Sequence, residues 1–167
     1  MSICAEELRE YVIQPTLNHL GEWSQAAENL LMGTAAQASG LGFHLLNKRG
    51  NGFGIYQITA NLHLDIWDHY LVDDPELASN VRGLASQHEF LRHPHAELAT
   101  NLSYATVIAW LAYRRCGLAL PAATDTLALA QFWAQNWGRP HSRRFRQAKI
   151  EAFINNYNKF VGRRLAA

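Results

Sequence analysis

Apolar positions recur at helical spacing along most of the chain, and short glycine or proline stretches separate the resulting segments. The clearest case is the run of Ala27, Leu31, Thr34, Ala35 and Ala38, which occupies one face of a helix. The expected helices span residues 5–13, 15–20, 25–37, 61–71, 74–87, 96–115, 122–137 and 142–161. The pattern therefore predicts a mainly α fold.

Helical periodicity is absent between Gly40 and Ile58. There, Gly50 and Gly52 lie between two short apolar runs, which predicts a β-hairpin or a glycine-rich loop over residues 43–58. A chain of 167 residues is long enough for one well-buried core and too short for two ordinary domains. We expect one mainly α domain over residues 1–167, with the apolar helix 96–115 surrounded by the others.

Composition and cysteine usage narrow the class of protein. The chain is 49% hydrophobic and 17% charged, which is typical of a soluble globular protein. No apolar run approaches the roughly 20 residues that cross a bilayer, and acids stand near the N-terminus where a signal peptide carries basic residues. Cys4 and Cys116 have no metal-type spacing, so we expect two buried free thiols.

The net charge of +1 conceals an asymmetry along the chain. From Arg139 onward, eight basic residues and one acid, Glu151, give a charge of +7, whereas residues 1–138, with seven basic and thirteen acidic residues, give −6. A basic end of this kind fits either a solvated helix face or attachment to an anionic polymer, such as nucleic acid or a cell-envelope polymer.

Position 38 is where the helical pattern suggests chemistry. It lies at the C-terminal end of the helix 25–37, on the face that carries the core residues. A carboxylic acid there would have its pKa raised by desolvation and by the negative end of the helix dipole, as a general acid for glycosidic-bond cleavage requires. The chain carries Ala38 instead, which neither donates nor accepts a proton.

Three segments together resemble the lysozyme-like superfamily: AAQASG at the end of the helix 25–37, GIYQI after the glycine-rich turn, and NLSYAT on the long helix. The resemblance is to goose-type lysozymes and soluble lytic transglycosylases, especially small phage-encoded ones. Their helix ends in Glu-Ser, with the glutamate as catalytic acid, and the matching pair here is Ala38-Ser39. The resemblance implies a lysozyme-like helical fold, peptidoglycan strands as the partner, and no cofactor or metal.

The resemblance also implies an activity and a set of site residues. The family cleaves the bond between N-acetylmuramic acid and N-acetylglucosamine, with either water or the muramic C6 hydroxyl as the attacking group. Gly54, Tyr56 and Gln57 match the segment beside the acid, where the Gln57 amide would bind N-acetyl groups. Asn101 and Tyr104 match the start of the central helix, with side chains expected to face the cleft; Asn101 equally fits an amide bonded to a loop.

Several interpretations of Ala38 remain open. The chain is either an engineered Glu-to-Ala variant or a natural non-catalytic glycan-binding protein, and both predict binding without turnover. Alternatively, Ala38 is a core alanine of an unrelated helical protein, for example a virion or nucleic-acid-associated protein that uses its basic C-terminal helix. With no signal peptide in the sequence, we expect synthesis in the cytoplasm and action at the bacterial wall after release by a phage or a secretion machine.

No other acid or histidine offers an obvious replacement for the missing proton donor. Glu28 lies ten residues before Ala38, which is about 15 Å along a helix axis. Asp65 and Asp68 are expected to be capping or surface acids. The spacing of the clustered histidines does not match a helical metal site, and we expect them in a loop. The clustered histidines are His88, His93 and His95.

Overall fold

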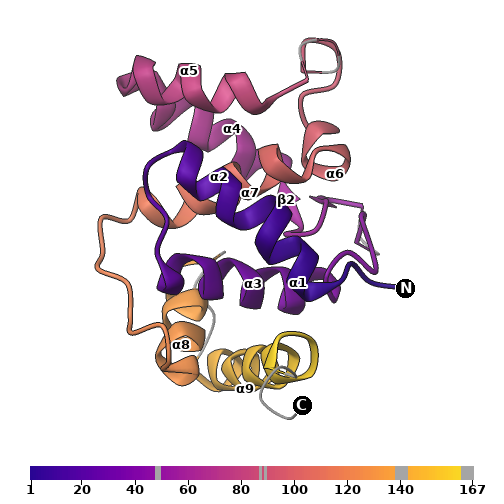
Figure 1. Cartoon of the computed structure of the whole chain (residues 1–167), viewed down its shortest axis with the longest axis vertical. Helices are drawn as coiled ribbons and strands as arrows, with labels where there is room; N and C mark the ends of the chain where they lie inside the picture. The colour runs from indigo at the N-terminus through magenta and orange to yellow at the C-terminus, as the bar shows by residue number, and fades with distance from the viewer. Residues whose placement is uncertain (48–49, 87, 89, 138–142, 163–167) are drawn as a thin grey trace.

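The computed structural model describes residues 1–47, 50–86, 88, 90–137 and 143–162, and these are mainly helical, with one two-stranded antiparallel sheet (Figure 1). The predicted fold class, mainly α with a small hairpin, is therefore confirmed. The first half contains α1 (Ala5–Leu8), the π-helix η1 (Arg9–Ile13), α2 (Gln14–His19) and α3 (Gln25–Ser39), followed by β1 (Gly52–Phe53) and β2 (Ile58–Thr59). The second half contains α4 (Ala60–His69), the 3-10 helix η2 (Leu71–Asp73), α5 (Pro75–Leu84), α6 (Glu97–Thr100), α7 (Leu102–Arg114), α8 (Thr126–Asn136) and α9 (Arg143–Phe160).

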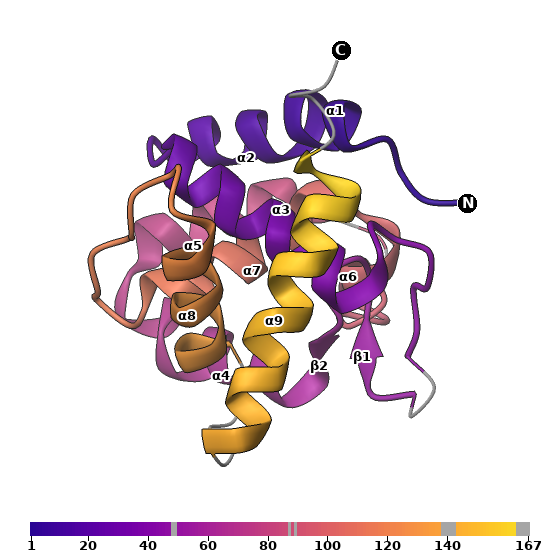
Figure 2. The same ribbon diagram turned by 90° about the horizontal axis from the view of Figure 1, so that it is seen from below.

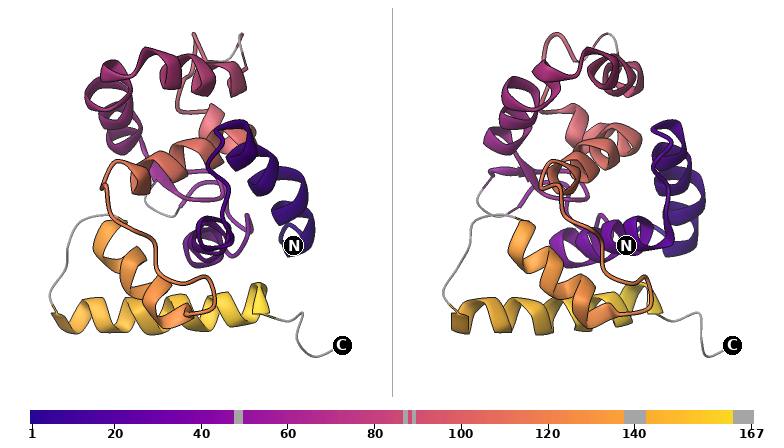
Figure 3. Two further views of the ribbon diagram at one scale, coloured as in Figure 1. Left: turned by 60° about the vertical axis from the view of Figure 1, so that its left-hand side comes forward. Right: turned by 90° about the vertical axis from the view of Figure 1, so that its left-hand side faces the viewer.

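The helices are arranged in layers around α7. In Figures 1 and 3, α4 and α5 lie at one end of the molecule, α8 and α9 lie at the other, and α3 and α7 lie between them. Helix α7 contacts α2, α3, α4 and α5, and its residues from Tyr104 to Tyr113 are all buried. The expectation that this apolar segment is surrounded by the other helices is confirmed.

Helix α9 packs across α3 and α8 (Figure 2). The crossing with α3 depends on Gly33, because a Cβ atom there would lie 2.2 Å from Cζ of Phe153. The Phe153 ring fills the space that the missing side chain leaves, and it is 0% exposed. Helix α9 is therefore part of the hydrophobic core and not an appendage.

Helix starts are set by capping side chains, and the helices expected over residues 25–37 and 74–87 begin within one residue of the predicted positions. Ser24 Oγ accepts from the Ala27 N–H (3.1 Å), and Asp74 Oδ1 accepts from the Leu77 N–H (3.0 Å). The expected start at Asn61 is wrong, because Thr59 Oγ1 accepts from the Leu62 N–H and α4 begins at Ala60. Helix α8 begins after Asp125 and not near residue 122, for the same reason.

The long helix expected over residues 96–115 is divided in two. Asn101 has an extended backbone (φ −121°, ψ 100°) and its Oδ1 accepts from the Tyr104 N–H at 3.0 Å. Asn101 therefore ends α6 and caps α7, which changes the direction of the chain at that point.

The two cysteines have free thiols, but the expectation that they are buried is wrong: Cys4 is exposed and Cys116 is partly exposed.

Within the described part of the chain, none of the helices combines the length and the apolar character needed to cross a bilayer.

Candidate functional site

Ala38 does not lie in sealed core. Helix α3 ends at Gly40, which has a left-handed backbone (φ +59°), and Ala38 is partly exposed in the last turn. It lines an open pocket of about 560 Å³, called the Ala38 pocket below. That volume is within the usual range for sites that bind small molecules. A side chain longer than that of alanine at position 38 would reach this space.

The Ala38 pocket is formed by the end of α3 and three other parts of the chain. Phe43 and His44 come from the loop after α3, Lys159 comes from the last turn of α9, and Met1 and Ser2 come from the N-terminal segment. Aromatic, imidazole and ammonium groups therefore border the pocket that Ala38 lines. Among the described residues that line the pocket there is no carboxylate, so no acidic group stands in for a glutamate at position 38.

Ser39 fastens the hairpin to α3. Its Oγ donates to the carbonyl oxygen of Ile55 (2.6 Å) and accepts from the N–H of Gly42 (2.8 Å), and the residue is only 5% exposed. These bonds occupy the hydroxyl group. Ser39 therefore positions the loop around Ala38 and does not present a free group to a ligand.

Gly54 is required by packing within the protein. Its φ is +71°, and a Cβ atom there would lie 1.6 Å from the carbonyl oxygen of Leu98. The hairpin turn thus lies directly against α6, and the Gly54 N–H donates to the Leu45 carbonyl oxygen at 2.7 Å. The close approach that this glycine allows is to protein backbone.

Two tyrosines expected beside the cleft are buried, and for them the expectation is wrong. Tyr56 is 0% exposed and its hydroxyl shares a 3.0 Å hydrogen bond with Thr106 Oγ1. Tyr104 is 0% exposed, and its hydroxyl lies 2.7 Å from His63 Nε2 and accepts from Trp67 Nε1 at 2.9 Å. Burial raises the pKa of both hydroxyls well above the usual value for tyrosine.

The Asn101 side chain is also hydrogen-bonded to other parts of the protein. Besides capping α7, it donates from Nδ2 to the Leu84 carbonyl oxygen (2.8 Å) and to Glu97 Oε2 (3.0 Å). The amide is bonded to α5 and α6 and is not free to face a cleft, and it caps a helix, so the alternative of an amide bonded to a loop does not describe it either. The amide joins the end of α5 to the start of α7.

Gln57 is the predicted site residue with an unused polar atom. Its backbone is left-handed (φ +53°), which is rare for a residue with a side chain. Nε2 donates to the carbonyl oxygens of Gly54 (2.7 Å) and His44 (3.2 Å). Oε1 is buried and has no hydrogen-bond partner among the described residues.

Gln57 lines a second pocket of about 500 Å³, called the Gln57 pocket below. Its walls come from α4, the end of α7 and the end of α8, and include Asp65, Arg115, Asn136 and Trp137. Arg115, Asn136 and Trp137 were not among the residues expected at a site. They are far from Gln57 in sequence, and the tryptophan fits the pattern of a core residue, so no local signal identifies them.

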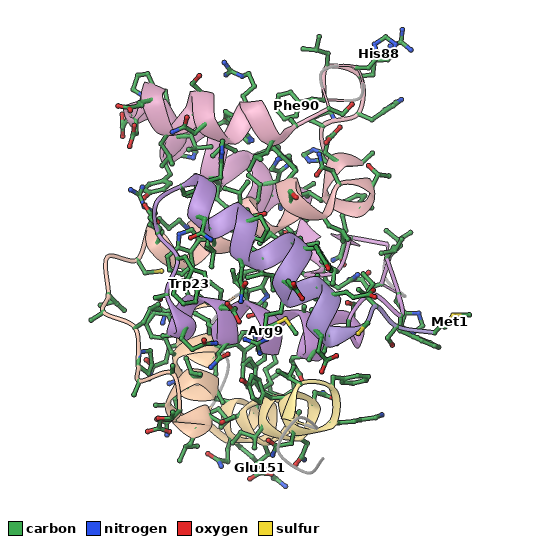
Figure 4. The ribbon with its side chains drawn as sticks, viewed as in Figure 1. Met1, Arg9, Trp23, His88, Phe90 and Glu151 are labelled. Atoms are coloured by element: carbon green, nitrogen blue, oxygen red, sulfur yellow. The ribbon has the colours of Figure 1, made fainter. Side chains whose placement is uncertain are left out.

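The remaining carboxylates are engaged in structural contacts. Glu28 is 0% exposed and accepts hydrogen bonds from Arg9, Trp23 and Gln25; Figure 4 shows Arg9 and Trp23 beside the first half of α3. Burial favours a higher pKa for this carboxyl, but the hydrogen bonds from Arg9 and Trp23 outweigh it and lower the pKa. Asp65 pairs with Arg115 and His69 and is a surface acid, as expected.

The described histidines are not grouped as a metal centre. His93 and His95 lie in the loop between α5 and α6, as expected, and His95 Nδ1 is 2.9 Å from Nδ1 of the buried His63. Burial, with a contribution from His95, lowers the pKa of His63 to about 4. In the described ranges no three histidine, cysteine or acidic side chains are grouped closely enough to hold a metal ion.

The site is thus an open pocket at Ala38 and a neighbouring pocket at Gln57, held together by the Ser39 and Gln57 hydrogen bonds. Comparisons with protein families, with curated proteins and with solved structures gave no match to this chain.

Proposed function

We propose that the protein is a lysozyme-like domain that binds peptidoglycan strands and lacks the acid that would cleave them. One observation carries the proposal: the last turn of the buried helix α3 presents Ala38 to an open pocket of about 560 Å³. An alanine in tightly packed core would have no room for a sugar. The resemblance of the AAQASG, GIYQI and NLSYAT segments to lysozyme-like enzymes supplies the substrate class.

The position of Ala38 suits a proton donor. It lies next to the carbonyl end of α3, where the helix dipole disfavours a negative charge, and it is partly shielded from water. The helix dipole would raise the pKa of a glutamate there and the Lys159 ammonium that borders the pocket would lower it, and the proposal requires the first effect to prevail. The glutamate would transfer its proton to the glycosidic oxygen, whether water or the muramic C6 hydroxyl then attacks the sugar. With alanine in its place, the strand binds and its bond stays intact.

The test restores the missing group. Purified cell walls are incubated with the chain as given, with Ala38→Glu and with Ala38→Gln, which matches the glutamate in size and lacks its acid. We expect the glutamate variant alone to clear the wall suspension, and all three proteins to sediment with walls. The proposal fails if the alanine form clears walls as fast as the glutamate form. It also fails if the folded glutamate variant is inert, or if none of the three binds walls.

The basic C-terminal helix is a candidate contact for an anionic cell-envelope polymer within the same proposal. Lys159 borders the Ala38 pocket, and Arg144 is exposed at the other end of α9. Charges on one helix that passes the pocket would hold the protein close to a negatively charged wall. The alternative of a nucleic-acid-associated protein predicts a steep decrease of DNA affinity with salt. Titration of the protein with DNA at increasing salt therefore separates a nucleic-acid-binding helix from a wall-binding one.

A further inference from the structure

We propose that the loop after α3 docks the protein on an anionic lipid surface, with the side chains of Phe43, Leu45 and Leu46 at the boundary between headgroups and hydrocarbon. Residues 43–46 are called the Phe43 loop below. The proposal does not depend on glycan binding at Ala38, because it rests on the exposure, the backbone bonding and the charges of this loop.

The Phe43 loop is a run of four exposed residues, of which three are large and apolar. Phe43 is 57% exposed, Leu45 is 47% exposed and Leu46 is 54% exposed. Exposed apolar residues that are scattered singly need no explanation, whereas a group of them marks a surface that contacts a protein or a membrane. In Figures 1 and 2, the chain after α3 lies at the edge of the molecule, beside the N-terminal segment. A large partner can therefore reach the loop.

The size of the apolar surface favours a lipid over a protein partner. Three side chains that are each about half exposed offer on the order of 300 Å² of apolar area. A stable protein interface takes about 800 Å² from each partner, with a complementary shape. A lipid surface needs no complementary shape, because its headgroups and acyl chains adapt to the side chains that enter it.

Backbone hydrogen bonds prepare the Phe43 loop for an apolar environment. The Leu45 carbonyl oxygen accepts from the Gly54 N–H at 2.7 Å, and the His44 carbonyl oxygen accepts from the Gln57 amide at 3.2 Å. Backbone groups without a partner are costly away from water. Since these two carbonyl groups are already bonded within the protein, the loop loses fewer bonds to water when it enters a bilayer surface.

Polar residues beyond the loop limit how deep it can enter. Asn47 Nδ2 donates to Asn51 Oδ1 at 2.9 Å, and the Asn51 N–H donates to Asn47 Oδ1 at 3.1 Å. This pair of amides belongs in water or among headgroups. The expected contact is therefore shallow, about 5–10 Å into the boundary between headgroups and acyl chains.

The charges near the loop favour an anionic surface. The loop borders the Ala38 pocket together with Lys159, whose side chain is exposed, and among the described residues that line the pocket there is no carboxylate. Residues 29–64 include no acid at all, and two basic residues, Lys48 and Arg49, are present there; these two lie outside the described residues and are counted from the sequence alone. Basic residues beside apolar ones are the usual combination at anionic lipid surfaces.

Sedimentation with lipid vesicles tests the proposal. One set of vesicles contains equal parts of phosphatidylglycerol and phosphatidylcholine, and the other contains phosphatidylcholine alone. We expect the protein to bind the anionic vesicles more tightly than the neutral ones. The double variant Leu45→Ser, Leu46→Ser should bind the anionic vesicles at least about tenfold more weakly.

A matched double variant controls for the loss of two exposed leucines. Leu118 is 59% exposed in the loop after α7, and Leu127 is 51% exposed on α8. In Figure 1 these two segments lie on the side of the molecule away from the N-terminal segment. Leu118→Ser, Leu127→Ser should therefore leave vesicle binding unchanged.

Hydrogen exchange with and without anionic vesicles locates the contact in the unaltered chain, so the test stands even where a variant unfolds. We expect slower exchange in the peptide that covers residues 41–47. Three results overturn the proposal: no sedimentation with anionic vesicles at millimolar lipid, equal sedimentation of the folded Leu45→Ser, Leu46→Ser variant, or protection confined to α9. A self-association that this variant abolishes, without any vesicle binding, would also overturn it and assign the loop to contact with a second copy.

Discussion

At the scale of single residues, the hairpin depends on backbone conformations that few residues adopt. Gly54 and Gly50 both have positive φ, but their surroundings differ: a Cβ at Gly54 would overlap the Leu98 carbonyl group, whereas Gly50 has nothing within 4 Å of such an atom. An alanine substitution at Gly50 therefore measures the free-energy cost of a left-handed backbone alone, and one at Gly54 adds the cost of a steric overlap.

We predict that Gly54→Ala destabilises the protein by about 3 kcal/mol or more, because the hairpin must move away from α6. Gly50→Ala should cost only about 1 kcal/mol, the price of a left-handed alanine. Urea unfolding of the two variants measures the difference. Equal losses at the two positions would mean that the hairpin does not press on α6 as described.

His63 gives the fold a pH dependence of known sign. Its pKa in the folded protein is about 4, lowered from a usual value near 6.5 by burial and by His95, so the unfolded chain takes up the proton more readily. Stability from this group is fully present above about pH 6.5 and decreases as the pH falls toward 4. The other groups facing it are the Tyr104 hydroxyl and the Trp67 indole, which bonds that hydroxyl.

We predict a loss of about 2–3 kcal/mol between pH 7 and pH 4 from this residue, at about 1.4 kcal/mol for each pKa unit. The free energy of unfolding of the native chain should decrease more steeply with acid than that of His63→Gln, which carries no titrating group. Parallel pH curves for the two proteins would contradict the assignment.

The spacing of apolar residues predicted the placement of position 38 at a helix end but did not predict which residues surround it. Spacing along α3 places Ala38 at a helix end, and the pocket there agrees with an inward or cleft-facing position. Periodicity does not tell a cleft from a core, because both lie on the apolar side of a helix. Tyr56 and Tyr104 were expected near a ligand from the lysozyme-like resemblance alone, and they are instead bonded to Thr106 and His63.

At the scale of elements, local capping signals predicted some helix starts and not others: α4 and α8 are capped by Thr59 and Asp125 and begin at other residues than expected. Ser24 and Asp74 begin α3 and α5 as expected, because each side chain bonds an N–H three residues ahead. The break at Asn101 was missed because it depends on Leu84 and Glu97, which α5 and α6 bring to the asparagine side chain. The cap itself is local, because Asn101 accepts from the Tyr104 N–H three residues ahead, but the bonds to Leu84 and Glu97 depend on the tertiary fold.

The contact between α3 and α9 offers a matched pair of helical glycines. We predict that Gly33→Ala costs about 1–3 kcal/mol, because the added methyl group meets the Phe153 ring and overpacks the interface. Gly83→Ala in α5, where nothing lies within 4 Å of the new Cβ, should instead stabilise the protein by up to about 1 kcal/mol. Thermal or urea unfolding tests the pair; a stabilising Gly33→Ala would show that α9 does not pack there.

At the scale of the whole molecule, α9 contributes to both the core and the surface charge. Ile150 and Phe153 are buried against the other helices, while Arg144 and Glu151 are exposed. Removing the C-terminal helix would therefore unfold the protein as well as remove its charge. The wall-binding role of the basic end has to be tested by single substitutions at exposed positions.

We predict that Arg144→Gln weakens sedimentation with cell walls at low salt, because it removes one positive charge near an anionic polymer. Glu151→Gln on the same helix should strengthen sedimentation, since it removes a negative charge. Both effects should diminish toward 0.5–1 M salt, where the screening length is about 3–4 Å. Opposite signs with the same salt dependence identify a charge effect, and unchanged binding in both variants would exclude one.

The N-terminal segment has a practical consequence for all of these assays. The Ile3 N–H donates to the Leu41 carbonyl oxygen at 2.9 Å, and Met1 and Ser2 form part of the rim around Ala38. In Figure 4, Met1 projects at the edge of the molecule. An affinity tag fused ahead of Met1 would lie at the opening of the Ala38 pocket. A tagged protein that fails to bind glycan could do so because the tag covers the pocket. The tag must therefore be removed before glycan binding is measured.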